Sequence, residues 1–77
     1  MEQIGLDGVF DGEGNVRVRR IEVDGAWQPV EQGRQWLDEE GRHVLVMLEG
    51  RRVQELLLDR AELKWHLKRR QHPRAAV

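Results

Sequence analysis

The chain has 77 residues, of which 35% are charged and 39% hydrophobic, and its formal net charge is −1. This length accommodates one small domain, and the apolar content is sufficient for a compact core, so the composition is not that of a disordered segment. The chain contains no Cys, Ser, Thr or Tyr. Disulfides, zinc thiolates and hydroxyl or thiol nucleophiles are therefore excluded, and an enzyme is the least favoured class.

The charged residues are unevenly distributed along the chain. Residues 1–50 carry 11 acidic and five basic side chains, whereas residues 51–77 carry three acidic and eight basic ones. This asymmetry predicts an acidic and a basic end. The longest apolar run, residues 44–48, is far shorter than the ~20 residues that cross a bilayer, and no basic leader follows Met1. We therefore expect a cytoplasmic protein.

The N-terminal segment predicts short strands separated by tight turns. Residues 4–10 favour a short edge strand, and the Gly- and Asn-containing residues 11–15 favour a turn. From residue 16, apolar and basic side chains alternate as in a half-buried strand. The alternation slips by one position at Arg19 and Arg20, which predicts a β-bulge there.

A second group of turn signals divides the middle of the chain. Asp24 and Gly25 favour a type I′ hairpin that leads into a strand over residues 26–30. Because Pro29 has no N–H to donate, this strand is predicted to lie at an edge or to end there. Gln32 followed by glycine predicts another turn.

Two further strands are predicted before residue 49. Residues 34–38 form one candidate strand, and residues 39–42 form a loop. Residues 43–48 are apolar on both faces, which predicts a central strand that is covered on each side.

The segment from residue 53 to residue 70 is ambiguous. Its Leu, Glu, Lys, Arg and Ala content favours a helix, but a helix would place Arg60, Lys64 and Lys68 on the apolar face. The alternation of Leu63, Trp65 and Leu67 with polar residues favours a strand. We therefore predict strand, single turn and strand, with one helix as the alternative.

These elements together predict an all-β or mainly β domain over residues 1–70, followed by a disordered tail over residues 71–77. Five or six short strands with frequent turn signals are typical of a small antiparallel barrel of SH3-like or OB-like size.

Three patterns of acidic residues or histidines are candidates for chemical sites, and the first has the spacing of a calcium loop. Asp11, Glu13, Asn15 and Glu22 have calcium-loop spacing, but Val16 occupies the position that requires Gly, and a strand follows. Calcium binding is therefore not predicted.

The histidines and the acidic run do not predict a cofactor or a catalytic site. His43, His66 and His72 lack the spacing of a metal pair, and no Cys joins them. Residues 38–40 are acidic, but they fall in a loop that is predicted to be exposed, where general acid-base catalysis is disfavoured. No catalytic residue, metal or cofactor is assigned.

Basic residues provide one candidate binding surface, because small β-barrels bind nucleic acids through cations and exposed aromatic rings. All three Trp residues are instead expected in the core, so this hypothesis ranks second. The candidate nucleic-acid contacts are Arg17, Arg19, Arg51, Arg52, Lys64 and Lys68.

The first-ranked function is a non-enzymatic module for protein interaction or self-association. Leu45 and Met47 are the candidate interface residues, because the strand that contains them is apolar on both faces. The partner is a second copy of the chain or another protein, and no membrane is implied.

A loose pattern of Trp and Gly residues spans residues 16–70. It comprises Asp24, Gly25, Ala26, Trp27, Val30, Trp36, residues 41–46, Glu55, Leu56 and residues 65–69. This pattern resembles a small bacterial domain of unknown function that occurs alone or appended to Y-family-like DNA polymerase subunits. The resemblance implies a compact β-rich accessory module near DNA-repair machinery, without catalytic residues to transfer.

Overall fold

The computed structural model describes residues 2–48 and 52–68, and these residues form strands and turns without a helix. The strands are β1 (Glu2–Gln3), β2 (Gly5–Phe10), β3 (Val16–Val23), β4 (Ala26–Pro29), β5 (Glu31–Leu37), β6 (Gly41–Leu48), β7 (Arg52–Asp59) and β8 (Trp65–Lys68). All pairings are antiparallel. The all-β prediction is confirmed. In the described part of the chain, no segment could cross a membrane as a helix.

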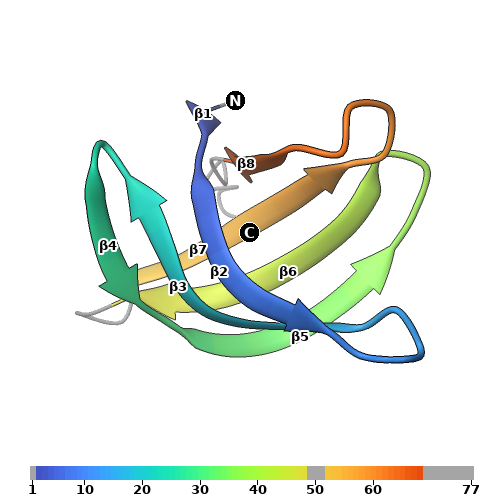
Figure 1. The fold of residues 1–77 in the computed structure, drawn as a ribbon, viewed down its shortest axis with the longest axis horizontal. Coiled ribbons are helices and arrows are strands. Elements are labelled where there is room, and N and C mark those ends of the chain that lie inside the picture. Colours follow the sequence, from blue (N-terminus) through green and yellow to red (C-terminus); the bar gives the residue numbers. More distant parts are fainter. Residues whose placement is uncertain (1, 49–51, 69–77) are drawn as a thin grey trace, which may run out of the picture.

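The strands form two sheets (Figure 1). One sheet has five strands in the order β1-β8-β7-β6-β5, and the other has three in the order β2-β3-β4. Strand pairing between the described residues does not join the sheets into one closed ring, so the SH3-like or OB-like barrel remains a prediction. Residues of both sheets nevertheless contribute to one hydrophobic core.

More strands are present than the five or six predicted, because two extended segments each contribute to both sheets. β1 and β2 meet at Ile4, whose N–H donates to the carbonyl of Trp65 on β8, the neighbour of β1 in the five-stranded sheet. β4 and β5 meet at Val30, whose N–H donates to the Arg19 carbonyl of the three-stranded sheet. Bends at these two positions therefore carry the chain from one sheet to the other.

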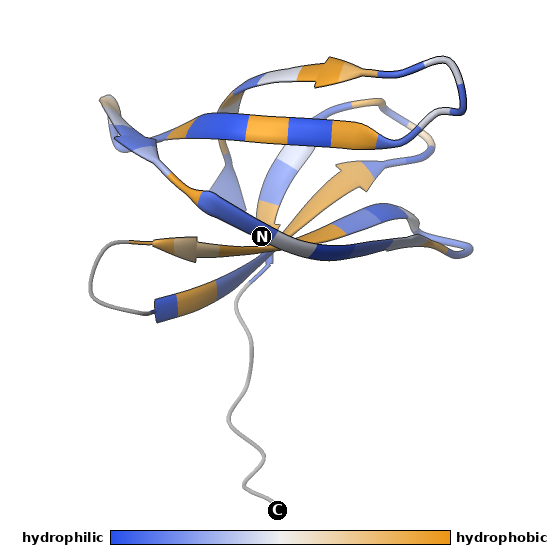
Figure 2. Ribbon diagram, turned by 90° about the horizontal axis from the view of Figure 1, so that it is seen from below, coloured by the Kyte–Doolittle hydropathy of each residue, from blue (hydrophilic) through white to orange (hydrophobic). Residues whose placement is uncertain are grey.

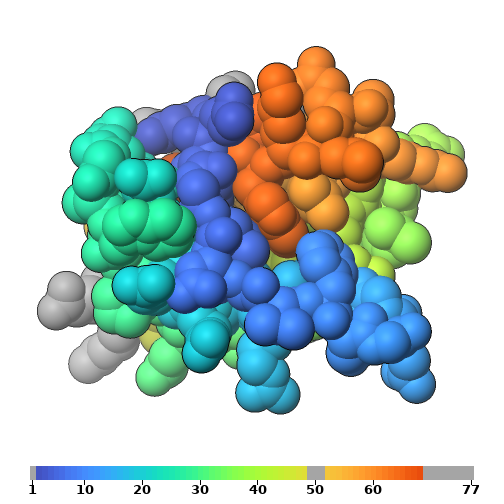
Figure 3. Space-filling model, in the orientation of Figure 1, coloured from blue at the N-terminus to red at the C-terminus, as the bar shows by residue number. Residues whose placement is uncertain are grey.

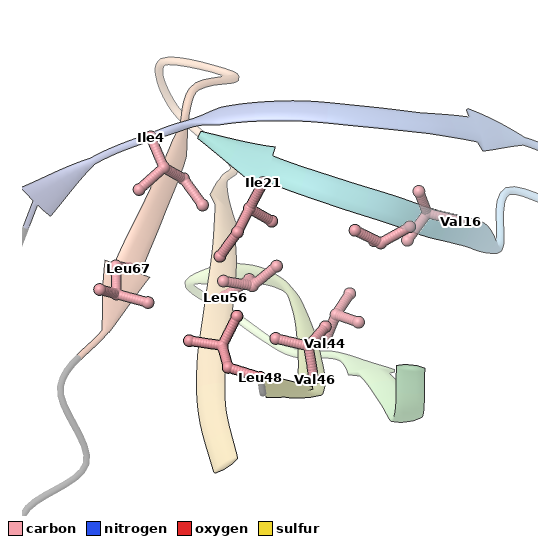
Figure 4. Packing of buried hydrophobic residues seen from close by; sticks show 9 residues of the cluster. Ile4, Val16, Ile21, Val44, Val46, Leu48, Leu56 and Leu67 are labelled. Atoms are coloured by element: carbon pink, nitrogen blue, oxygen red, sulfur yellow. The ribbon is translucent and has the colours of Figure 1, made fainter. Parts of the chain in front are cut away.

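The core lies between the two sheets and follows from the alternation of side chains along each strand. Figure 2 shows this alternation as hydrophobic and hydrophilic bands along the ribbons. Figure 4 shows Ile21 of β3 pointing toward Leu56 of β7, with Val44 and Val46 of β6 nearby. Figure 3 shows β2 lying across the front of the molecule, between β4 and the β7–β8 turn.

The local predictions for β3 and its hairpin are confirmed. Asp7 pairs with Arg20 and Gly8 with Val18, so Arg19 is the extra residue of a bulge in β3. Asp24 and Gly25 have φ angles of 55° and 81°, as a hairpin turn of the predicted kind requires. β4 is an edge strand that ends at Pro29.

The turn predicted at Gln32 and Gly33 is wrong, because both residues lie within β5. Gly33 instead marks an irregularity in strand pairing. Gln32 pairs with Val46 and Gln35 pairs with Val44, so three residue steps along β5 oppose two along β6. An extra residue at this position explains why a glycine is present without a chain reversal.

The two glutamines of β5 connect the sheets where no strand pairing does. Gln35 accepts the Val16 N–H through Oε1 at 2.9 Å and donates from Nε2 to the Val16 carbonyl at 2.8 Å. Gln32 accepts the Val18 N–H at 2.7 Å and also donates to the Val16 carbonyl. Side-chain amides therefore satisfy backbone groups of β3 that a neighbouring strand would otherwise pair.

The C-terminal ambiguity is resolved in favour of strand, turn and strand. β7 and β8 pair in antiparallel register, and a turn connects them. The alternative helix over residues 53–70 is therefore wrong for residues 53–68. The predicted disordered tail, residues 71–77, lies outside the described residues.

Candidate functional site

The candidate site lies on the side of the five-stranded sheet that faces away from the core, here called the outer face. Strand register places its side chains in three rows that cross β5 to β8. The first row contains Trp36, His43, Leu57 and His66, the second Leu45, Glu55 and Lys68, and the third Glu31, Met47 and Val53. Neither His43 nor Leu57 belongs to the core cluster, although both are buried.

His43 is the one buried polar or charged side chain of the described residues, with 2% of its surface exposed. Its ring stacks on Trp36 with a centroid separation of 5.0 Å and an interplanar angle of 2°. His43 Nδ1 lies 2.7 Å from Glu55 Oε2, and His43 Nε2 lies 2.8 Å from Asp38 Oδ1. Both nitrogens can donate to ionised carboxylates only when the ring is an imidazolium.

Glu40 and Lys68 complete the group that is here called the His43 cluster. Its members are Asp38, Glu40, His43, Glu55 and Lys68. Glu40 Oε1 lies 3.6 Å from His43 Nε2 and accepts a hydrogen bond from Lys68 Nζ at 2.8 Å. Lys68 Nζ also lies 3.9 Å from Glu55 Oε2. The hydrogen bond to Glu40 raises the pKa of Lys68 above its ordinary value. The cluster therefore places the Lys68 ammonium against Glu40 and close to Glu55, which favours the ionised forms of these groups.

The hydrogen bond from His43 lowers the pKa of Asp38 below its ordinary value of 3.8. Because the folded-state pKa is lower than the unfolded-state pKa, the ionised form stabilises the fold above the ordinary value, and this contribution is lost as pH falls through the folded-state pKa. We expect Asp38→Asn to reduce stability near neutral pH and to have a smaller effect below pH ~3. Urea unfolding of both proteins at the two pH values measures this difference, and an equal difference at both would contradict it.

The other end of the outer face is apolar. Met47 and Val53 are paired across β6 and β7, with 39% and 45% of their surfaces exposed. Leu45 is half-buried beside them. Arg34 lies 5.1 Å from the Trp36 ring centre and adds a cation–π contact at the margin of this apolar patch.

A second acidic and histidine-containing group lies at the β7–β8 turn. One ligand atom from each of Asp59, Glu62 and His66 lies within 4.8 Å of the other two. Asp59 Oδ1 accepts the backbone N–H groups of Glu62 and Ala61, and these bonds lower the Asp59 pKa. His66 Nδ1 is buried and has no hydrogen-bond partner.

The structure does not bring the predicted nucleic-acid contacts together. Arg17 and Arg19 lie on β3, Arg52 begins β7, and Lys64 lies beyond the opposite end of β7. Lys68 is engaged in the His43 cluster. Arg51 lies outside the described residues.

The tryptophans also differ from expectation. Trp27 is exposed on β4, where Arg20 lies 5.3 Å from its ring centre, and Trp36 lies on the outer face. Trp65 alone packs against the core, as a partly buried residue. The prediction that all three occupy the core is therefore wrong for Trp27 and Trp36.

The partners of His43 and the group at the β7–β8 turn were not predicted from the sequence. A usable signal was present, because a histidine in an otherwise apolar central strand needs a polar partner when it is buried. The partners are carboxylates, two in the turn that precedes β6 and one on β7, so the spacing of His and Cys residues alone does not reveal them.

No protein-family model, curated protein or solved structure matches this chain. The resemblance to the bacterial accessory domain therefore remains a prediction.

Proposed function

We propose that this chain is a non-enzymatic interaction module that self-associates through the apolar end of the outer face. The observation that carries this proposal is the exposure of Met47 and Val53 side by side on paired central strands. Their strands already bury a core on the opposite side, so the outward apolar side chains are not required for the fold of one copy. Association would remove this apolar surface from water.

A second copy of the chain is the partner that this patch fits best. In a two-fold symmetric contact the same patch faces itself, so Met47 and Val53 would pack against apolar groups of the other copy. The patch margin carries both signs of charge, with Glu31 beside Met47 and Arg34 over Trp36. Such a margin allows opposite charges to meet across the contact.

The non-enzymatic part of the proposal is supported by the chemistry of the outer face. The His43 cluster pairs its carboxylates with His43 and Lys68. The chain contains no hydroxyl or thiol side chain that His43 could activate as a nucleophile.

Light scattering across a concentration series tests the proposal, with Val53→Asp as the disrupting variant. We expect the wild-type chain to form dimers, and Val53→Asp to raise the dimer dissociation constant by at least about tenfold, because each contact would bury two unpaired carboxylates. Val9→Asp is the matched control, since Val9 is an exposed strand valine of the other sheet. A wild-type monomer at every concentration would overturn the proposal, as would equal effects of the two variants.

Binding to nucleic acid is the competing function, and the separation of its candidate residues disfavours it. Phosphate contacts release counterions, so such binding must weaken steeply with salt. Salt-sensitive, saturable binding of a labelled oligonucleotide by Val53→Asp, together with a monomeric wild-type chain, would favour that function.

A further inference from the structure

We propose that Asp59, Glu62 and His66 form a binding site for a divalent transition-metal ion, with Zn²⁺ as the probe. Asp59 ends β7, Glu62 lies in the following turn, and His66 lies in β8. The site is therefore contained within one hairpin. This inference does not rest on self-association, because all three residues belong to the same chain and lie at the other end of the outer face from Val53.

The three side chains lie close to the separation that a small cation needs. Their ligand atoms lie within 4.8 Å of one another. Zinc bonds to His nitrogen and carboxylate oxygen are about 2.0–2.2 Å long, so ligands in a tetrahedral site lie about 3.4 Å apart. Glu62 is exposed and the other two residues are half-buried, so rotation of the side chains can close the remaining gap of roughly 1 Å.

The hydrogen-bonding state of His66 is a second observation in favour of a ligand. Its Nδ1 is buried without a partner, whereas both nitrogens of His43 contact carboxylates. A buried polar atom without a partner carries a desolvation cost. We infer that Nδ1 is the ligand nitrogen, because a cation bound there would supply the missing interaction.

The two histidine-containing groups therefore differ in how readily they could bind a metal ion. Asp38, Glu40 and His43 also have ligand atoms close together. In that group, however, Lys68 donates to Glu40 and His43 donates to Asp38, so a metal would have to displace two existing interactions. The Asp59 group requires no such displacement at His66.

The donor set and its surroundings indicate the class of ion. One imidazole nitrogen and two carboxylate oxygens suit Zn²⁺, Mn²⁺ or Co²⁺, whereas Ca²⁺ and Mg²⁺ prefer oxygen alone. A surface groove lined by Glu39, Glu40, Leu57, Asp59, Arg60 and Ala61 lies beside the site. This groove gives water access to the ion, so water can complete a coordination shell that has three protein ligands.

Calorimetric titration of the chelator-treated full chain with Zn²⁺ tests the proposal. We expect one ion per chain, and a loss of affinity of at least about tenfold in both Glu62→Gln and His66→Gln. Glu62→Gln keeps the inference testable if His66→Gln fails to fold, since Glu62 is exposed in a turn. Titration with Co²⁺ provides a second measurement, because nitrogen and oxygen ligation gives visible absorption that the same variants would lose.

Two control variants identify which histidine group binds the ion. Glu40→Gln removes a carboxylate from the His43 cluster, and His72→Gln removes a histidine of the C-terminal segment. Both are expected to bind Zn²⁺ within about twofold of the wild-type affinity. The proposal is overturned if the wild-type chain shows no saturable binding. It is equally overturned if Glu40→Gln or His72→Gln abolishes binding while Glu62→Gln retains it.

Discussion

Replacement of Gly41 by alanine is expected to lower the free energy of unfolding by about 3–4 kcal/mol. Gly41 begins β6 with a φ of 145°, a conformation that residues with a side chain rarely adopt. A Cβ atom at this position would overlap the Leu58 carbonyl oxygen and lie 2.9 Å from the Arg60 nitrogen. Both obstacles are backbone atoms of the neighbouring strand and turn, so the clash cannot be relieved by side-chain rotation.

Gly12→Ala is the matched control for this measurement. Gly12 lies in an exposed turn, and a Cβ atom there would have no neighbour within 4 Å. Urea unfolding should therefore show a change within about 0.5 kcal/mol for Gly12→Ala. A Gly41→Ala protein as stable as this control would refute the close approach of β6 and β7.

Replacement of His43 by alanine is expected to destabilise the fold by about 3 kcal/mol. The substitution removes a buried ring that stacks on Trp36 and leaves a cavity on the outer face. It also removes the ring whose two nitrogens contact Asp38 and Glu55, so both carboxylates lose a hydrogen-bond partner. Thermal or urea unfolding monitored by tryptophan fluorescence measures the loss.

His66→Ala distinguishes the role of His43 from the general cost of truncating a histidine in this sheet. His66 is half-buried in the same row of the outer face, and its Nδ1 lacks a hydrogen bond. We expect this control to lose about 1 kcal/mol or less in metal-free buffer. Equal losses for the two variants would show that the carboxylate contacts of His43 contribute little to stability.

Local sequence patterns were sufficient to predict most of the strands. The slip in alternation at Arg19 predicted the bulge, and Asp24 with Gly25 predicted the hairpin, because both depend only on neighbouring residues. The turn predicted at Gln32 failed for a related reason. Glycine at an irregularity within a strand gives the same local signal as glycine at a chain reversal.

The candidate site could not be predicted in the same way, because it depends on the register of strands that are distant in sequence. His43, Glu55 and Lys68 come from β6, β7 and β8, and they meet only when these strands pair as observed. The positions of Trp27 and Trp36 likewise depend on which side of each strand faces the core. The position of Leu45 and Met47 on the outer face could be predicted, because an apolar pattern on both faces is visible within one strand, and their role in an interface stays a prediction.

The connection between β3 and β5 has a consequence for the internal motion of the domain. The amide protons of Val16 and Val18 are held by Gln35 and Gln32 side chains, whereas the paired strands of each sheet are held by backbone ladders. Rotation of these two glutamines would release both protons to solvent without breaking any strand pairing. The hydrogen-exchange rates at Val16 and Val18 would thus report side-chain rotation along one boundary of the domain, while the amides of β6 and β7 would exchange only when the sheet itself opens.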